Sequence, residues 1–215
     1  MLCNAVGTVQ PSQIIDMSYA TTSAIGTYSA SFNGDTSGIE MPCLKEDMFI
    51  SDYTLSFWVY PLDNGRAVYF GDYGMTNTSG INFERKADGT FRYYHNGSPD
   101  WGSGKGITTE NTWTMLTVTY TPGKLTLYKN GVEETSLNHT ATLTKNINSA
   151  VRIGRDSRTL ANSGETPFKG YMNDFRFYCS CLSKEEVEEL YSTKGMISDC
   201  GDCESYEIIE DKENF

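Results

Sequence analysis

Carboxylates in suitably spaced pairs can act as the acid and the base of a hydrolytic reaction, so they are the first residues to consider. Glu84 is alone on its predicted strand, and the two histidines, His95 and His139, are far apart beside predicted turns. Other regularly placed acids lie on the exposed face of a predicted helix: Glu185, Glu186, Glu188 and Glu189. The chain also lacks G-x-S-x-G, H-E-x-x-H and Walker motifs. The sequence therefore predicts that this protein is not an enzyme.

Residues 94–106 indicate a binding site for a ligand, because aromatic, amide and acidic side chains occur there among glycines. Sugar binding needs an aromatic platform for the apolar face of the ring, with amides and carboxylates around it for the hydroxyls. Trp101 is the candidate platform, and the alternative is that it folds back over the edge of the domain. Trp58 and Trp113 are predicted to be core residues. The other candidate ligand-binding residues are Asp100, Asn96, Tyr94, Tyr73, Asn77 and Arg158.

Six cysteines offer another chemistry. Cys200 and Cys203 are close enough to bond across a turn, whereas Cys179 and Cys181 share one strand face, where a bond between them would be strained. If the C-terminal segment folds back onto that strand, these four sulfurs form a zinc site. We prefer reduced, unliganded thiols, which are typical of a protein made in the cytosol.

The elements that must position these residues are strands. Residues 112–131 contain two alternating runs, 114–121 and 124–129, which predict two strands joined by the tight turn Pro122-Gly123. Asn130-Gly131 then predicts a second sharp turn. The same patterns predict an all-β domain, with further strands near 14–15 and over 28–32, 37–41, 54–60, 66–71, 80–85, 91–95, 151–155 and 168–178.

One helix is predicted near the C-terminal end. Residues 183–186 form a capping box, in which the Ser183 side chain and the Glu186 side chain satisfy each other's backbone amides. The apolar face of that helix would contain Val187, Leu190 and Tyr191. These patterns divide the chain into an N-terminal arm, the β domain and an acidic tail with a short strand, over residues 1–25, 26–195 and 196–215.

Three segments, in the same order, resemble the laminin-G-like domains of the concanavalin A-like lectin and glucanase superfamily. They are TLSFWVYP at 54–61, the hairpin that ends in LTLYKNG at 125–131, and FKGYMNDFRFYCSCLSKEEVEELY at 168–191. The resemblance implies a two-sheet antiparallel jelly-roll sandwich with one short C-terminal helix. Glucanases of this superfamily carry a Glu-x-Asp-x-Glu or Glu-x-Asp-x-x-Glu run on one strand, and this chain has no such run.

The same resemblance implies a structural calcium ion. Members of the superfamily often hold one ion between the turn after the first sandwich strand and an aspartate of the last strand. The matching positions here are Gly34 and Asp35 in the turn Asn33-Gly34-Asp35, and Asp174 in YMNDFRFY. Carboxylate and carbonyl oxygens are suitable ligands for Ca2+. In the alternative, Asp35 is only a turn residue and Asp174 marks an exposed strand edge.

Composition excludes several partners. The net charge of -11 disfavours nucleic acid and anionic membranes, because no basic stripe is available to displace counterions. There is no apolar run long enough to span a bilayer, and the first residues lack the pattern of a secretory signal.

Without an export signal, and with an arm and a tail, the chain resembles the laminin-G-like domains of phage virion proteins. We therefore expect a carbohydrate-binding module on a virion surface, with a bacterial cell surface or the extracellular space as the alternative. Its expected partners are a surface or mucosal polysaccharide and other virion or surface proteins, which would contact the arm or the tail. A purely structural decoration or spacer protein is the alternative function.

Overall fold

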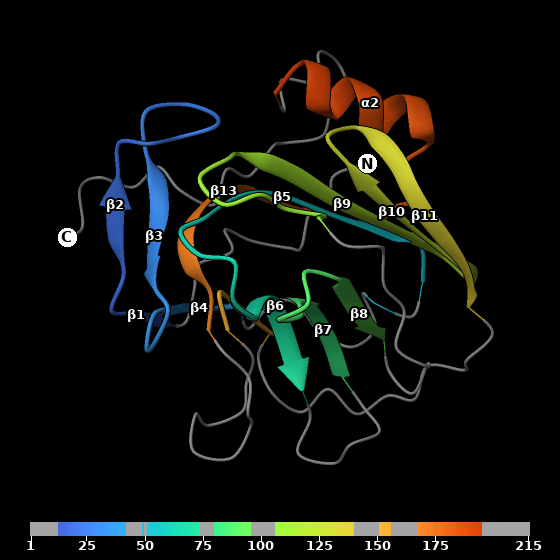
Figure 1. Ribbon diagram of the computed structural model, residues 1–215. Coiled ribbons are helices and arrows are strands. Elements are labelled where there is room, and N and C mark those ends of the chain that lie inside the picture. Colours follow the sequence, from blue (N-terminus) through green and yellow to red (C-terminus); the bar gives the residue numbers. More distant parts are fainter. Residues whose placement is uncertain are drawn as a thin grey trace.

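The computed structural model describes residues 13–41, 49, 51–73, 80–95, 106–139, 151–155 and 167–194, and these form two antiparallel sheets packed face to face (Figure 1). The six-stranded sheet contains, from edge to edge, β1 (Gln13–Ile15), β4 (Gly38–Met41), β12 (Val151–Ile153), β6 (Ala67–Tyr73), β7 (Gly80–Arg85) and β8 (Phe91–His95). The seven-stranded sheet contains β11 (Val132–His139), β10 (Gly123–Lys129), β9 (Thr114–Thr121), β5 (Tyr53–Pro61), β13 (Lys169–Tyr178), β3 (Ser29–Asn33) and β2 (Ser18–Ala20). The predicted β-sandwich is confirmed.

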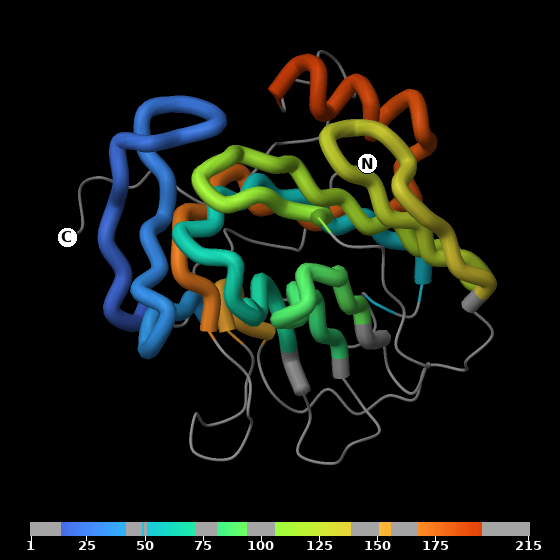
Figure 2. The backbone as a smooth tube through the Cα atoms, viewed as in Figure 1, coloured from blue at the N-terminus to red at the C-terminus, as the bar shows by residue number. Residues whose placement is uncertain are grey.

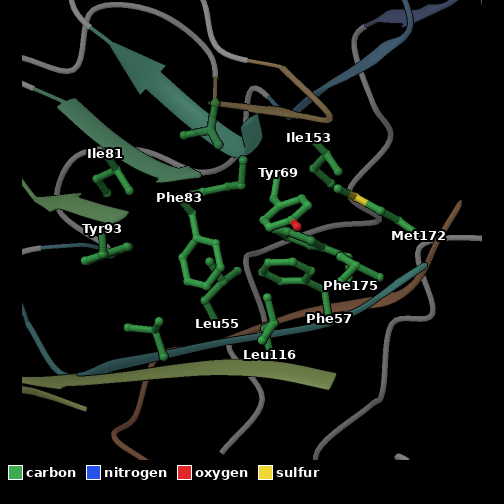
Figure 3. Packing of buried hydrophobic residues seen from close by; sticks show 14 of the residues in the cluster. Leu55, Phe57, Tyr69, Ile81, Phe83, Tyr93, Leu116, Ile153, Met172 and Phe175 are labelled. Carbon is green, nitrogen blue, oxygen red and sulfur yellow. The ribbon is translucent and has the colours of Figure 1, made fainter. Parts of the chain in front are cut away.

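The core lies between the two sheets, because alternate residues of the inner strands point inward (Figure 3). Phe57 of β5 packs edge-to-face against Phe83 of β7, with ring centroids 5.1 Å apart. Tyr53 of β5 and Tyr93 of β8 are fully buried, and their hydroxyl groups share a hydrogen bond between the sheets. Burial is possible for these hydroxyls because each provides the other's partner.

The central hairpin has the predicted turns. Thr121 of β9 pairs with Lys124 of β10, so Pro122 and Gly123 form the tight connection. Asn130 and Gly131 both have positive φ, 51° and 79°, which is the backbone conformation that the Asn-Gly pair favours. Figure 2 shows β9, β10 and β11 following one another through these two turns. β11 is an edge strand with mostly polar side chains, because backbone pairing at a sheet edge does not require apolar ones.

Helix α2 (Lys184–Ser192) lies on the side of the seven-stranded sheet away from the core (Figure 1). The predicted capping box is present, since Ser183 accepts from the Glu186 amide and Glu186 accepts from the Ser183 amide. Val187 and Leu190 are buried against Trp58, Met115 and other residues on that face of the sheet. Across the described residues no helix is both long enough and apolar enough to cross a membrane.

The predicted N-terminal arm is partly built into the sandwich. β1 pairs with β4 at the edge of the six-stranded sheet, and β2 pairs with β3 at the edge of the seven-stranded sheet. The strand near residues 14–15 is thus confirmed, and β2 is an additional strand. The predicted acidic tail, 196–215, lies outside the described residues.

The cysteines differ from the prediction. Cys179 is disulfide-bonded, whereas Cys181 is a free, partly buried thiol. The prediction of reduced thiols is therefore wrong for Cys179. A sulfur held in a disulfide is not available as a thiolate ligand, so Cys179 does not contribute to the alternative zinc site. Burial raises the pKa of the Cys181 thiol.

Candidate functional site

A polar row crosses the outer face of the six-stranded sheet. The register places Glu40 opposite Arg152, Arg152 opposite Gly71, and Gly71 opposite Asn82. Residues directly opposite each other in antiparallel strands share one face of the sheet. The neighbours of these residues along each strand belong to the core: Ile39, Ile153, Phe70 and Phe83. The row therefore points away from the core.

Asn82, at the centre of β7, is fully buried on this face. Neither its amide nitrogen nor its amide oxygen has a hydrogen-bond partner in the described part of the chain. Gly71 stands opposite it and has no side chain that could pair with it. A buried amide without partners costs free energy, so native proteins normally satisfy such a group with water or a ligand. Asn82 is thus a buried polar group whose hydrogen-bonding capacity the described residues leave unused.

Glu84 lies two residues further along β7, on the same face, and is also fully buried. Its carboxylate accepts from Arg92 Nη1 at 2.9 Å and from Arg66 Nη2 at 3.2 Å. Two guanidinium groups compensate a buried negative charge and hold the carboxylate in one orientation. This arrangement provides a rigid, charged neighbour for Asn82.

The carboxylates on this face do not form a hydrolytic pair. Glu40 accepts from Arg152 Nη2 at 3.0 Å, and three strand-to-strand steps separate its strand β4 from β7. At about 4.8 Å a step, β4 and β7 are about 14 Å apart, and Glu84 is also two residues out of register with Glu40, whereas glycoside hydrolases place their two carboxyl groups about 5–9.5 Å apart. Glu40 and Glu84 are therefore too far apart to act as the two carboxylates of a glycoside hydrolase.

The structure places some of the predicted ligand residues beside this row. Tyr94 occupies the register position opposite Asn82, and Tyr73 is the last residue of β6, opposite Gly80. Because β6 ends and β7 begins here, and β8 ends here too, the segments that contain Asn77 and Trp101 both adjoin this end of the sheet. Asn77, Asn96, Asp100, Trp101 and Arg158 lie outside the described residues.

Arg158 belongs to a segment that adjoins the other end of the sheet. β12 runs antiparallel to β6, so it ends near Tyr69, whose carbonyl accepts from the Gly154 amide at 2.8 Å. The segment returns at Pro167, which bridges to Val68. The flanks of Arg158 and of Asn77 are thus at opposite ends of β6.

The predicted calcium ligands are not brought together. Asn33 of the predicted turn pairs with Lys169, the first residue of β13, whereas Asp174 lies near the middle of that strand. The five intervening steps correspond to about 16 Å along a strand. Asp174 has a positive φ of 51° at a bulge, and its Oδ1 accepts from Arg176 Nε at 2.6 Å. Asp35 is exposed, and its amide donates to Asn33 Oδ1 at 2.8 Å. Calcium binding at Asp174 stays a prediction.

The family is shown by the sequence. A family model described as the concanavalin A-like lectin/glucanases superfamily matches residues 33–188, which is more than half of the chain. This chain belongs to that superfamily. No curated protein matches the concanavalin A-like chain significantly.

Solved structures have the same fold. Domain 4 of AbnA, a GH43 extracellular arabinanase from Geobacillus stearothermophilus, in complex with arabinotriose, is 25% identical, with a TM-score of 0.63, covering 86% of this chain and 87% of that one. The CBM40 of the Ruminococcus gnavus IT-sialidase, bound to alpha2,3 sialyllactose, is 12% identical, with a TM-score of 0.61, covering 76% of this chain and 96% of that one. The binding domain of Paraclostridial Mosquitocidal Protein 1 is 18% identical, with a TM-score of 0.65. The match covers 85% of the present chain and 47% of the chain of the mosquitocidal protein.

Sequence reasoning did not identify Asn82 as a candidate residue. The signal was present, because Asn82 is the polar residue between the apolar residues Ile81 and Phe83 of an alternating strand. The sequence around Asn82 does not show that Gly71 stands opposite it. That identity depends on the pairing of β6 with β7, which only the structure gives.

Proposed function

We propose that this concanavalin A-like domain is a non-catalytic carbohydrate-binding and adhesion module. The observation that carries the proposal is the buried, unpartnered amide of Asn82 on the polar outer face of the six-stranded sheet. An amide offers both donors and an acceptor, and a sugar hydroxyl both donates and accepts, directly or through one water. The ligand would bind on this outer face, and Trp101 and Asn77 stay predicted contacts.

The comparisons support this class of ligand. The arabinotriose complex of AbnA domain 4 aligns over most of both chains at 25% identity. A module that binds and does not cleave also agrees with the separation of Glu40 and Glu84 and with the absence of a Glu-x-Asp-x-Glu run.

For its location, we propose display on the outside of a virion, or otherwise on a bacterial surface or in the extracellular space. The disulfide at Cys179 supports an exterior, oxidising location over a permanently reduced one. Further virion or surface proteins would attach through the arm or the tail. The net charge of -11 makes nucleic acid and anionic lipid unfavourable partners.

A glycan array tests the proposed function with three proteins: the wild-type chain, Asn82→Leu and Asn138→Leu. Leucine has nearly the shape of asparagine and removes the amide. Asn138 is an exposed strand residue at the edge of the other sheet, so its variant is the matched control.

We expect the wild type and Asn138→Leu to bind the same glycans, and Asn82→Leu to lose most of that signal. A blank array from folded wild-type protein would contradict glycan binding and favour the purely structural function. Equal binding by Asn82→Leu would contradict the proposed site.

A further inference from the structure

A row of three aromatic rings lies on the other sheet. Tyr171 of β13 stands opposite Tyr60 of β5, and Trp113 precedes Thr114, whose partner is Val59. The ring centroids are 5.5 Å apart for Tyr60 and Tyr171, and 5.4 Å apart for Tyr60 and Trp113. The three side chains therefore form one continuous aromatic row across three strands, on the face of the seven-stranded sheet that points away from the core.

This aromatic row is partly exposed, unlike the tryptophan beside it. Trp58, two residues before Tyr60 on the same face, is 7% exposed, because Tyr191 of α2 stacks on it with centroids 5.5 Å apart. The described contacts of the helix include neither Tyr60 nor Tyr171, and both rings keep part of their surface in solvent. The prediction that Trp113 is a core residue is wrong, since its ring is only partly buried at the border of the helix-covered region.

The chemistry around the aromatic row is polar. The indole nitrogen of Trp113 is buried, so the polar groups that a ligand can reach are those at the rim of the row. Ser31 stands opposite Tyr171, and Lys169 and Thr112 are exposed beside the row. An alkyl or lipid ligand would leave this polar rim unpaired. A sugar chain offers apolar ring faces for the aromatic side chains and oxygen acceptors for the donors.

The size of the surface separates a sugar from a protein partner. An aromatic side chain has about 150–250 Å² of surface, and no more than about a third of each ring is exposed here. The row therefore offers roughly 200 Å², whereas a stable protein interface buries about 800 Å² per partner. A short stretch of an oligosaccharide fits this area.

We propose that the row of Tyr60, Trp113 and Tyr171 is a second glycan-binding surface, which stacks against the rings of a pentose or hexose oligosaccharide. The inference rests on the proposed function for the class of ligand, but it uses different residues on the opposite outer face of the sandwich. One domain with a binding surface on each outer face can hold two glycan chains at once and link them.

The test uses the full chain, arabinotriose and soluble linear arabinan. Trp113→Ala and Tyr171→Ala remove ring faces, and Tyr171→Phe restores one. Tyr19→Ala is the matched control, because Tyr19 is an exposed aromatic residue on β2 outside the row. Each protein is also combined with Asn82→Leu, so that the two surfaces are measured separately by tryptophan fluorescence and by the turbidity of cross-linked arabinan.

We expect Trp113→Ala and Tyr171→Ala each to weaken arabinotriose binding in the Asn82→Leu background about three- to tenfold, and to abolish arabinan cross-linking in the wild-type background. Tyr19→Ala should leave both unchanged, and Tyr171→Phe, which keeps the ring, should bind more tightly than Tyr171→Ala. If the alanine variants bind and cross-link like the wild type, the second surface is refuted while the function stands. If they lose binding and Asn82→Leu does not, the aromatic row is supported and the site at Asn82 is refuted. A folded wild type that binds neither sugar contradicts both.

Discussion

Two buried strand asparagines should respond in opposite directions to the same substitution. Asn82 has no partner for either amide atom in the described part of the chain. Asn173 is 8% exposed, and both of its amide atoms are used. Its Oδ1 accepts from the Ile25 amide and its Nδ2 donates to the Tyr28 carbonyl, each at 2.9 Å. Replacing each residue with leucine therefore removes a cost at one site and two hydrogen bonds at the other.

The magnitudes follow from these contacts. A buried polar group without a partner costs about 1–3 kcal/mol, so we expect Asn82→Leu to raise the free energy of unfolding by about 1–2 kcal/mol. Asn173→Leu leaves the Ile25 amide and the Tyr28 carbonyl without their partner and should lower it by about 2–4 kcal/mol. For a domain of this size, about 1 kcal/mol corresponds to about 2–4 °C in Tm.

The assay is urea unfolding of the ligand-free protein, monitored by fluorescence and circular dichroism. An unchanged m value with a higher midpoint for Asn82→Leu, and a lower midpoint for Asn173→Leu, is the expected result. If Asn82→Leu destabilises the protein as much as Asn173→Leu does, then the Asn82 amide is satisfied in the free protein and the reasoning about the site fails.

Three further predictions concern stability. Arg85 is buried and donates to the carbonyls of Asp63, at 2.7 Å, and Gly65, at 2.9 Å. Arg85→Met should therefore lower the free energy of unfolding, measured in urea, by about 2–4 kcal/mol. A decrease of less than about 1 kcal/mol contradicts this role of Arg85. Burial raises the pKa of both Tyr53 and Tyr93 in the folded state, so stability should be complete below the unfolded pKa of about 10 and fall as the pH rises above it. The double variant with phenylalanine at both positions should show a flatter alkaline decline, and equal declines would refute this account. If calcium binds through Asp174, chelator should lower the Tm of the wild type and calcium should restore it. The Tm of Asp174→Asn should not respond, and asparagine tolerates the positive φ of this position. A wild-type Tm that is the same in chelator and in calcium contradicts the calcium proposal.

Local chemistry was enough to predict much of the fold. The turns at Pro122-Gly123 and Asn130-Gly131 and the capping box at Ser183 depend on residues within a few positions of one another. The alternation of strands such as Thr114–Thr121 identified which side chains face the core. These features lie in the sequence itself, because turn and cap geometry and strand periodicity are local properties.

The site depended on contacts that the sequence does not display. Alternation shows that Trp58 and Tyr60 share a face, but not that helix α2 covers the first and leaves the second partly exposed. The resemblance to the superfamily suggested calcium ligands in the Asn33 turn and at Asp174, and the pairing of Asn33 with Lys169 separates them. The disulfide at Cys179 likewise depends on long-range geometry.

Resonances of the Asn82 side chain test the central claim most directly. The amide group of Asn82 is assigned in a 15N-labelled spectrum of the full chain by its absence from Asn82→Leu, and the strongest oligosaccharide from the glycan array is then titrated in. The account predicts that the Asn82 amide signals shift with the same saturation curve as the bound sugar and become protected from solvent exchange. Signals that stay in place while the sugar binds elsewhere would contradict a glycan site on the outer face of the six-stranded sheet.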